Sequence, residues 1–460
     1  MKKKLGFVLA LLLLVPSIAL AVDVGGIKLG GEVQMRGYEL NNFWSFYDDS
    51  NKSYPYATAA DFSDYYRVDD DWSVFRIKTA LNVSADLGDN VFGYIRISNQ
   101  TYGENIENTE YKGQRDGDNI DNKVFVENAF IDVKNIASVP FSLRIGRQNL
   151  MYGSGFVLFD GQSQFASTSM YFDGIKGTYN FTDTIMLDAF YVIDQENNRA
   201  NNSASDGGGD DIYLMGLYLT ASDWSPIGGK QEVYAMQRKD QSLDMDIKMF
   251  GVRFSDKFDM GLDYSLEGAK QLGQSAWSYA GDYDQDAWGG KADLGYTFTA
   301  VEAKPRIFTQ YAYMSGDDPE TDDFEGWNVF YGGWPQFGDL LAWKFVNVPW
   351  NNNANYDYYW AAGTTPGEAA YSNLRIATVG ASCVAGPVAP SVSYSKINLD
   401  QTYGYGYDSD DFGDYYQANV SYQYNKALSF AAYYAVLMPG DAFWGTDDAY
   451  EFYWEAKLKF

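Results

Sequence analysis

Hydrophobic and polar residues alternate most regularly in the last eleven positions of the chain. Counting back from Phe460, every second residue is apolar or aromatic, and the residues between them are polar or charged except Tyr453. An alternation with a period of two predicts a β-strand with one face in an apolar medium and the other in water. Residues 450–460 are therefore predicted to form such a strand.

The same alternation begins near the N-terminus. Residues 27–36 and 75–87 each carry apolar side chains at every second position, with polar or charged side chains between them. The Gly-Asp-Asn sequence at 88–90 has the composition of a tight turn, and a partner strand is predicted over about 91–102.

The links between these segments alternate strictly between short and long. Short links are predicted near 88–90, 135–139, 182–184, 221–229, 255–257, 299–303, 385–387 and 425–426. Longer links are predicted near 43–71, 103–121, 151–170, 194–211, 239–245, 272–286, 315–370, 398–413 and 438–449. Together they separate about 18 strands.

This rhythm predicts an all-β fold, a transmembrane antiparallel β-barrel with short periplasmic turns and long extracellular loops. An even number of strands places both termini on the periplasmic side. The strand that ends on Phe460 is typical of the closing strand of an outer-membrane barrel. The alternative is a β-sandwich or a soluble propeller, which would not need alternate turns to be shorter.

The first 21 residues have the pattern of a secretory signal peptide. Three lysines at 2–4 precede an apolar run at 5–15, and Ala19-Leu20-Ala21 fits a small-x-small cleavage site. The run is shorter than the roughly 20 residues that a membrane anchor needs. We therefore expect 1–21 to be a signal peptide and 22–460 to be a single barrel.

Composition agrees with a barrel in the outer membrane of a diderm bacterium. Aromatic residues make up 17% of the chain, with 39 tyrosines, and Tyr and Trp gather at membrane interfaces. The expected partners are the outer-membrane bilayer and the barrel-insertion machinery. A formal charge of −28 excludes nucleic acid as a partner, because phosphate binding needs a basic face.

Candidate chemistry is sparse. The absence of histidine removes the commonest general base and imidazole metal ligands, so neither an enzyme nor a metal site is expected. The single cysteine, Cys383, allows no intrachain disulfide, and no cofactor is expected. Asp282, Asp284 and Asp286 are spaced like the start of a calcium loop but lack its glycine and terminal glutamate, which favours a chance cluster.

If the apolar faces meet lipid, the opposite faces line the lumen. Acidic residues share this face with the basic candidates, which are Arg36, Arg76, Lys78, Arg96, Arg144, Lys176, Arg253 and Lys291. Two interpretations remain open. The basic side chains could select anions, or the mixed charges could simply solvate a wide channel.

The predicted loop 315–370 is long and rich in aromatic residues. Exposed loops rarely carry so many aromatic side chains without burying them. Since long structured loops are usually functional, we expect this loop to form a constriction or lid at the mouth. The alternative is that its aromatic residues pack only against other loops.

Several segments together resemble the alginate export family of outer-membrane channels. They are residues 85–90 (ADLGDN), 126–134 (VENAFIDVK), 143–148 (LRIGRQ) followed by Tyr152-Gly153, and 172–176 (FDGIK). Their order and spacing are similar to that family over about residues 70–180. The second half matches only by strand rhythm and by Phe460.

The resemblance implies an eighteen-stranded barrel that passes a polyanionic polysaccharide through a lumen lined by arginines and lysines. Carried over to matching positions, it implies that Arg144, Arg147 and Asp173 line the pore. Simple alternation from Arg144 puts Arg147 on the lipid side. Either Gly146 marks a bulge that turns Arg147 inward, or Arg147 lies near the rim.

The predicted function is a passive outer-membrane channel for anionic or sugar-like solutes or polysaccharide. The alternatives are a general diffusion porin without polysaccharide specificity and a barrel that anchors a surface partner. One departure bears on the cargo. Without the three lysines of 1–21 the formal charge is −31, and strongly acidic outer loops are poorly suited to capturing a polyuronate.

Overall fold

The computed structural model describes fourteen segments of the chain, and the predicted signal peptide at 1–21 lies outside them. The described residues are 22–24, 26–42, 72–102, 124–159, 172–195, 212–223, 228–241, 244–277, 281–318, 320–332, 336–346, 371–402, 409–442 and 447–460.

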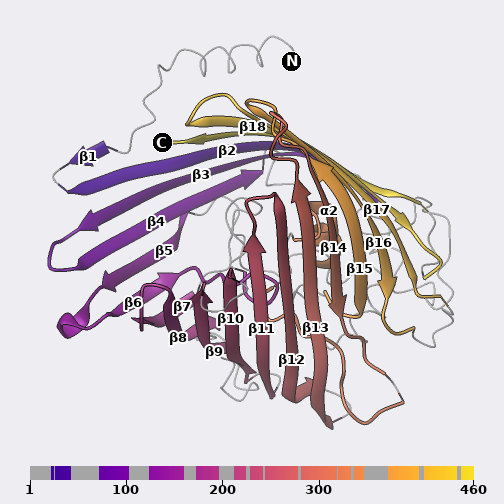
Figure 1. Ribbon diagram of the computed structural model, residues 1–460, viewed down its shortest axis with the longest axis horizontal. Coiled ribbons are helices and arrows are strands. Elements are labelled where there is room, and N and C mark those ends of the chain that lie inside the picture. Colours follow the sequence, from indigo (N-terminus) through magenta and orange to yellow (C-terminus); the bar gives the residue numbers. More distant parts are fainter. Residues whose placement is uncertain are drawn as a thin grey trace, which may run out of the picture.

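Eighteen antiparallel strands, β2 to β19, close into a barrel (Figure 1). Each strand pairs with the next along the chain, and β19 pairs back with β2, which confirms the predicted strand number and the fold. The short strand β1 (Val22–Val24) pairs with the start of β2. The barrel strands are β2 (Ile27–Asn41), β3 (Trp72–Asp86), β4 (Val91–Tyr102), β5 (Val124–Val133), β6 (Phe141–Gln148), β7 (Phe172–Asn180), β8 (Ile185–Gln195), β9 (Ile212–Ser222), β10 (Lys230–Asp240), β11 (Met245–Lys257), β12 (Leu262–Trp277), β13 (Gly281–Thr297), β14 (Arg306–Met314), β15 (Leu374–Ser382), β16 (Val388–Leu399), β17 (Asp411–Gln423), β18 (Leu428–Pro439) and β19 (Ala449–Lys459).

The alternation in the sequence sorts side chains between the two faces of the wall. On β2, Gln34, Arg36 and Tyr38 are buried inside the barrel. On neighbouring β3, Leu81 and Val83 are exposed on the outside. Since residues paired across antiparallel strands point to the same side, this assignment can be followed around the whole barrel through the strand register.

The closing seam joins the two ends of the barrel sequence. The Gly31 amide donates to the Phe460 carbonyl at 2.7 Å, and the Phe460 amide donates to the Gly31 carbonyl at 3.0 Å. The Phe460 ring occupies the space over Gly31, where a Cβ atom would lie 2.6 Å from the ring. The terminal aromatic therefore fills the gap that the glycine leaves in the wall.

Two of the predicted long links were wrong. Only residues 241–244 lie between β10 and β11, so the link predicted near 239–245 is short. Most of the link predicted at 272–286 belongs to the paired strands β12 and β13, which are long. These strands extend beyond β14 at the lower edge of Figure 1. The predicted short turn at 255–257 lies instead at 258–261.

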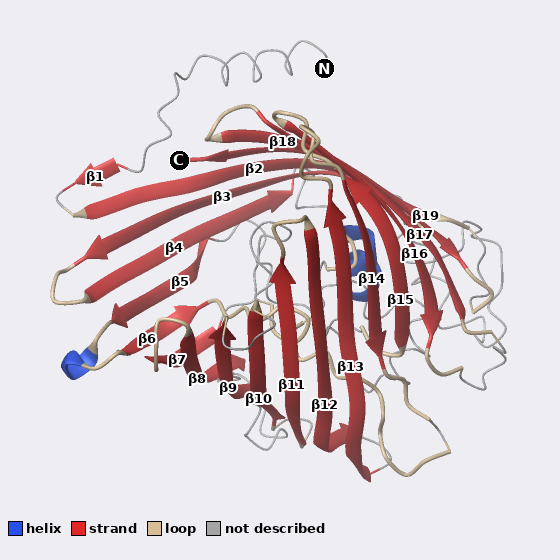
Figure 2. Ribbon diagram, viewed as in Figure 1, coloured by secondary structure: helices blue, strands red, loops and turns tan. Residues whose placement is uncertain are grey.

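Helical structure is minor. A 3-10 turn, η1 (Ile136–Ser138), lies in the β5–β6 link, and α2 (Asp339–Val346) lies inside the ring of strands (Figure 2). Within the described segments, no helix is both long enough and apolar enough to cross a bilayer.

Candidate channel interior

Basic side chains gather on the inner face of β2–β4. Arg36 lies opposite Arg76 in the strand register. It forms ion pairs with Glu455 of β19 and, at 3.2 Å, with Asp339 at the start of α2. Both arginines are buried, and the Arg76 guanidinium lies 5.3 Å from the centre of the Tyr38 ring. The inner wall therefore holds α2 through a charged contact.

The same sector continues with Lys78 and Arg96. Lys78 is buried between Gln34 and Gln100, which flank it in the register. Arg96 donates to Glu127 at 2.9 Å and lies 4.0 Å from Glu32. The strand register thus brings these two predicted basic residues together with Arg36 and Arg76 on one inner surface.

Arg144 and Lys176 are register neighbours on β6 and β7. Arg144 makes a bidentate ion pair with Asp132, at 2.6 and 2.8 Å, and its guanidinium lies 3.9 Å from the centre of the Phe130 ring. Lys176 lies 3.5 Å from Asp188. In both pairs the base is more exposed than the acid: 32% against 13%, and 25% against 7%.

Arg253 repeats this arrangement on β11. It forms an ion pair with Glu232, lies 3.8 Å from Glu267, and is 12% exposed while each glutamate is 1% exposed. Lys291 behaves differently, because it is less exposed than Asp293, 3.7 Å away. Lys291 also donates to Gln336, 3.3 Å away in the β14–β15 link.

Arg147 and Asp173 lie on the other face of the wall. They pair in the register and form a bidentate ion pair with distances of 2.8 and 2.6 Å. Arg147 is an odd number of positions from the lumenal Arg144 and an even number from Ile145, which is exposed on the outside. Arg147 and Asp173 therefore share the outward face with Ile145. Gly146 has a φ of +124° but causes no shift in register, and the pair lies at the rim end of its strands.

The inner face of β15–β18 is chemically different from the rest of the lumen. All residues of these four strands are described, and their register puts no charged side chain on the inner face. Thr378 and Ser395 hydroxyls lie 2.7 Å apart, and the Tyr433 hydroxyl donates to Gln417 at 3.0 Å. The inner Ser, Thr, Asn and Gln side chains are Thr378, Ser382, Ser391, Ser393, Ser395, Gln417, Asn419, Ser421, Gln423 and Ser429.

Two links enter the lumen and form one interior body, here called the plug, made of the described residues 149–159, 324–332 and 336–342. Residues Leu158 and Tyr331 form a parallel bridge, and the Phe156 and Trp327 rings stack with centroids 5.6 Å apart. The plug side chains join inner residues from opposite walls, such as Tyr38 and Met249, in one buried apolar cluster. The plug therefore occupies part of the lumen through apolar packing against the inner face of the wall.

Polar contacts fix the plug to the wall. The Ser154 hydroxyl donates to Glu267 at 2.7 Å, and the Tyr152 hydroxyl donates to Asp188 at 2.9 Å. Burial and the charge of Asp188 raise the pKa of Tyr152, so this phenol stays a neutral donor. The backbone amide of Asn328 donates to the side-chain oxygen of Gln271 at 2.9 Å. The plug therefore depends on acids that also hold lumenal bases.

Trp327 of the plug fits against a glycine in the wall. Trp327 is fully buried, and a Cβ atom on Gly289 would lie 2.7 Å from its ring. Gly289→Ala is therefore expected to displace the indole and destabilise the barrel by about 1–3 kcal/mol, the usual range for an overpacked core. Denaturant unfolding in detergent micelles measures this change. The matched control is Gly268→Ala, where a Cβ atom meets nothing within 4 Å and stability should not change.

A carboxylate in the β14–β15 link gives a pH-dependent contact. Burial, with the charges of Glu325 and Asp318 nearby, raises the pKa of Asp317 to about 6 from its usual 3.8. The folded link therefore favours the neutral acid, so its stabilising effect is greatest below about pH 4 and is lost as pH rises through 6. Hydrogen exchange across 317–325 should show lower protection at pH 7 than at pH 5, relative to Asp317→Asn. An equal ratio at both pH values would contradict this.

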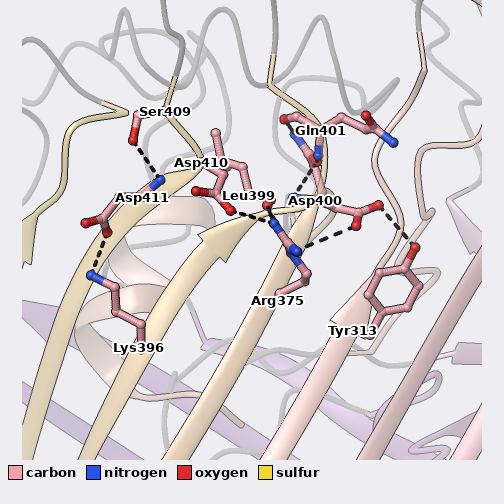
Figure 3. A network of polar contacts seen from close by, with 10 residues as sticks. Tyr313, Arg375, Lys396, Leu399, Asp400, Gln401, Ser409, Asp410 and Asp411 are labelled. Carbon is pink, nitrogen blue, oxygen red and sulfur yellow. Dashed lines mark hydrogen bonds and ion pairs between the residues drawn. The ribbon is translucent and has the colours of Figure 1, made fainter.

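A second polar network holds the rim on the outer face (Figure 3). Arg375 donates to Asp410 at 2.7 Å and lies 4.0 Å from Asp400, which accepts from the Tyr313 hydroxyl at 3.1 Å. Lys396 lies 2.7 Å from Asp411. These contacts join the ends of β14–β17 around the β16–β17 link, whose residues 403–408 lie outside the described segments.

Comparison with known proteins decides the family. A family model described as alginate export matches residues 96–456, more than three quarters of the chain. The chain belongs to the alginate export family. The resemblance found in the sequence over about 70–180 is thereby confirmed and extended to the second half. No curated protein sequence matches the chain.

Solved structures with the same fold are outer-membrane proteins of the Occ type. OccK9 (OpdG) of Pseudomonas aeruginosa has a TM-score of 0.55 and 9% identity, covering 94% of this chain and 98% of that one. OccAB1 of Acinetobacter baumannii has a TM-score of 0.54 and 12% identity, covering 94% and 96%. At these identities the likeness shows the fold alone. With the family match, it supports a passive outer-membrane channel.

Sequence reasoning missed two parts of this alginate export family interior. It did not predict that residues 149–159 enter the lumen, although the apolar run Phe156-Val-Leu-Phe159 within a predicted long link was a usable sign. It also missed the uncharged wall of β15–β18. The serine repeat at 391, 393 and 395 was the corresponding sign, because it occupies alternate positions of one strand.

Proposed function

We propose that this channel passes small anionic and sugar-like solutes. The observation that carries the proposal is the difference in exposure within the lumenal ion pairs. The acid is the more exposed partner at Arg36 and Lys291, but at Arg144, Lys176 and Arg253 the base is more exposed than its acidic partner. Formally neutral pairs then present a positive surface to a passing solute, and such a surface raises the local concentration of anions.

The uncharged wall supports the sugar-like part of the proposal. Hydroxyl and amide groups on β15–β18 can donate and accept hydrogen bonds without the desolvation cost of a charge. A solute with both an acidic group and hydroxyl groups would meet the basic surface on one side and this wall on the other. The substrate class therefore follows from two surfaces of different chemistry in one lumen.

The plug is proposed as the constriction of the channel. It includes residues 324–332 and 336–342 of the aromatic-rich loop predicted at 315–370, together with 149–159 from the β6–β7 link. Its buried apolar packing leaves less room for a long polymer than for a small solute. A plug that stays docked favours small solutes, and a plug that moves aside would allow a polysaccharide to pass.

We further infer that the protein lies in the outer membrane of a diderm bacterium and is inserted by the barrel-insertion machinery. The closing strand supports this inference, because its terminal Phe460 completes the seam with β2. The lipid bilayer is the expected surrounding of the outer face, where large apolar side chains such as Leu81 and Phe250 are exposed.

Liposome swelling with matched solutes tests the proposed substrate class. Purified barrel in liposomes should admit a six-carbon sugar acid faster than the neutral hexose, and the hexose faster than the corresponding amino sugar. Equal rates for all three would indicate a general diffusion porin. No swelling with a folded barrel would favour a barrel that anchors a partner. Block of the acid flux by oligouronates would extend the cargo to polysaccharide.

A further inference from the structure

An apolar groove crosses the outer face of the barrel between β8 and β14, with its centre over β11–β13. The groove has a volume of about 650 Å³ and continues into a second depression of about 360 Å³. Val252 and Gly268 line both parts. The groove is a recess in the wall itself, and it lies on the side opposite the lumen.

Two neighbouring glycines form the floor of the recess. Gly268 and Gly290 pair in the register, so two adjacent strands lack an outward side chain at the same height. A Cβ atom on Gly268 would meet nothing within 4 Å. At Gly37, by contrast, the Trp454 ring fills the space over the glycine. The Gly268 position is left unfilled by the chain.

The recess lies within the surface that hydrocarbon covers. Its sides are outward side chains that are large and well exposed, including Val233, Phe250, Leu266 and Tyr311. In a bilayer every part of this band must contact lipid chains or another apolar surface. The occupant of the recess must therefore be apolar where it meets the floor.

Only one end of the recess is charged. Lys270 lies there with its amino group 4.4 Å from the centre of the Trp288 ring, and it also forms an ion pair with Asp286. This end points toward the extracellular tips of β12 and β13. An indole beside a lysine is typical of the membrane–water interface, where lipid head groups lie.

We propose that this groove binds one acyl chain of an outer-leaflet lipid, with the phosphate-bearing head group near Lys270. Continuity with the hydrocarbon-facing band requires an apolar occupant, and the polar Lys270–Asp286 pair beside Trp288 at the outer end matches the position of a lipid head group in that leaflet. The glycine floor of the recess lies on two strands about 4.8 Å apart, a spacing that suits a hydrocarbon chain.

Native mass spectrometry of barrels extracted from outer membranes in mild detergent tests this proposal. The wild-type barrel should carry an adduct of lipid mass. Gly268→Leu fills the recess from outside and should lower the occupancy of that adduct roughly tenfold, the loss expected when two buried methylene groups are displaced. Heat-modifiable mobility on gels would show that the variant is folded.

Gly93→Leu provides the matched control. Gly93 is an outward-facing glycine on β4 whose Cβ atom would also meet nothing within 4 Å, and it lies away from the groove. This variant should keep the wild-type adduct. Wild-type barrel without lipid, Gly268→Leu with undiminished lipid, or equal loss in both variants would overturn the proposal. A dimer mass that only Gly268→Leu abolishes would overturn it in favour of a second copy of the chain.

Discussion

Replacing Val157 by aspartate is expected to open the channel. Val157 is fully buried in the plug, where its carbonyl accepts the Tyr331 amide at 3.4 Å. A carboxylate in this apolar cluster would cost at least about 3 kcal/mol, which shifts the docking equilibrium of the plug by more than about a hundredfold. The barrel wall is not altered, so single-channel conductance in a planar bilayer should rise markedly above that of the wild type.

Val139→Asp is the control for this experiment. Val139 lies in the periplasmic β5–β6 turn and is exposed, so a carboxylate there remains solvated. Its conductance should equal that of the wild type. If folded Val157→Asp conducts no more than Val139→Asp, the plug does not limit passage. Ser154→Ala should raise the single-channel conductance less than Val157→Asp does, because it removes only one hydrogen bond between the plug and Glu267.

Charge reversal is expected to change the ion selectivity at one of two arginines of the same strand and not at the other. Arg144 faces the lumen beside Lys176, and Arg147 faces outward with Asp173. Arg144→Glu changes the lumenal charge by two units. At about 8 Å in water this is worth roughly 1 kcal/mol for each ion, with opposite signs, and screening over a Debye length of about 10 Å halves it, so the anion-to-cation permeability ratio should fall roughly fivefold. Arg147→Glu should leave the ratio unchanged.

The reversal potential in a salt gradient measures this difference. The salt should be about 0.1 M or lower on the dilute side, where the Debye length is about 10 Å and lumenal charges are not fully screened. Arg144→Gln and Arg147→Gln form a milder pair in which no like charges are brought together. An equal shift for both arginines would show that the register does not separate lumenal from outer positions.

The fold could be predicted from the sequence because lipid and water impose the alternation on each strand. The failures lie where that constraint ends. At the extracellular end of β12 the inner face carries buried polar side chains such as Gln271, which contacts the plug, so residues 271–277 mix Gln, Ser and Gly with apolar residues and lose the two-residue period. Sequence alone therefore placed a long loop where the structure has paired strands.

The interior could be predicted only in part. Counting alternate positions from Arg144 correctly places Arg144 and Arg147 on opposite faces of β6, because this count needs only one strand. The contact of Ser154 with Glu267 joins residues 113 positions apart, and no local pattern encodes it. The difference in side-chain exposure between the base and the acid of an ion pair depends on which residues from other strands or from the plug cover the acid. Such information exists only after the strands and the plug are assembled.

The reversal potential of the wild-type channel tests the basic lumenal surface most directly. With purified barrel in a planar bilayer and a tenfold potassium chloride gradient, the sign of the zero-current voltage should report preference for chloride. A sign that reports preference for potassium would contradict the proposed basic surface at Arg144, Lys176 and Arg253.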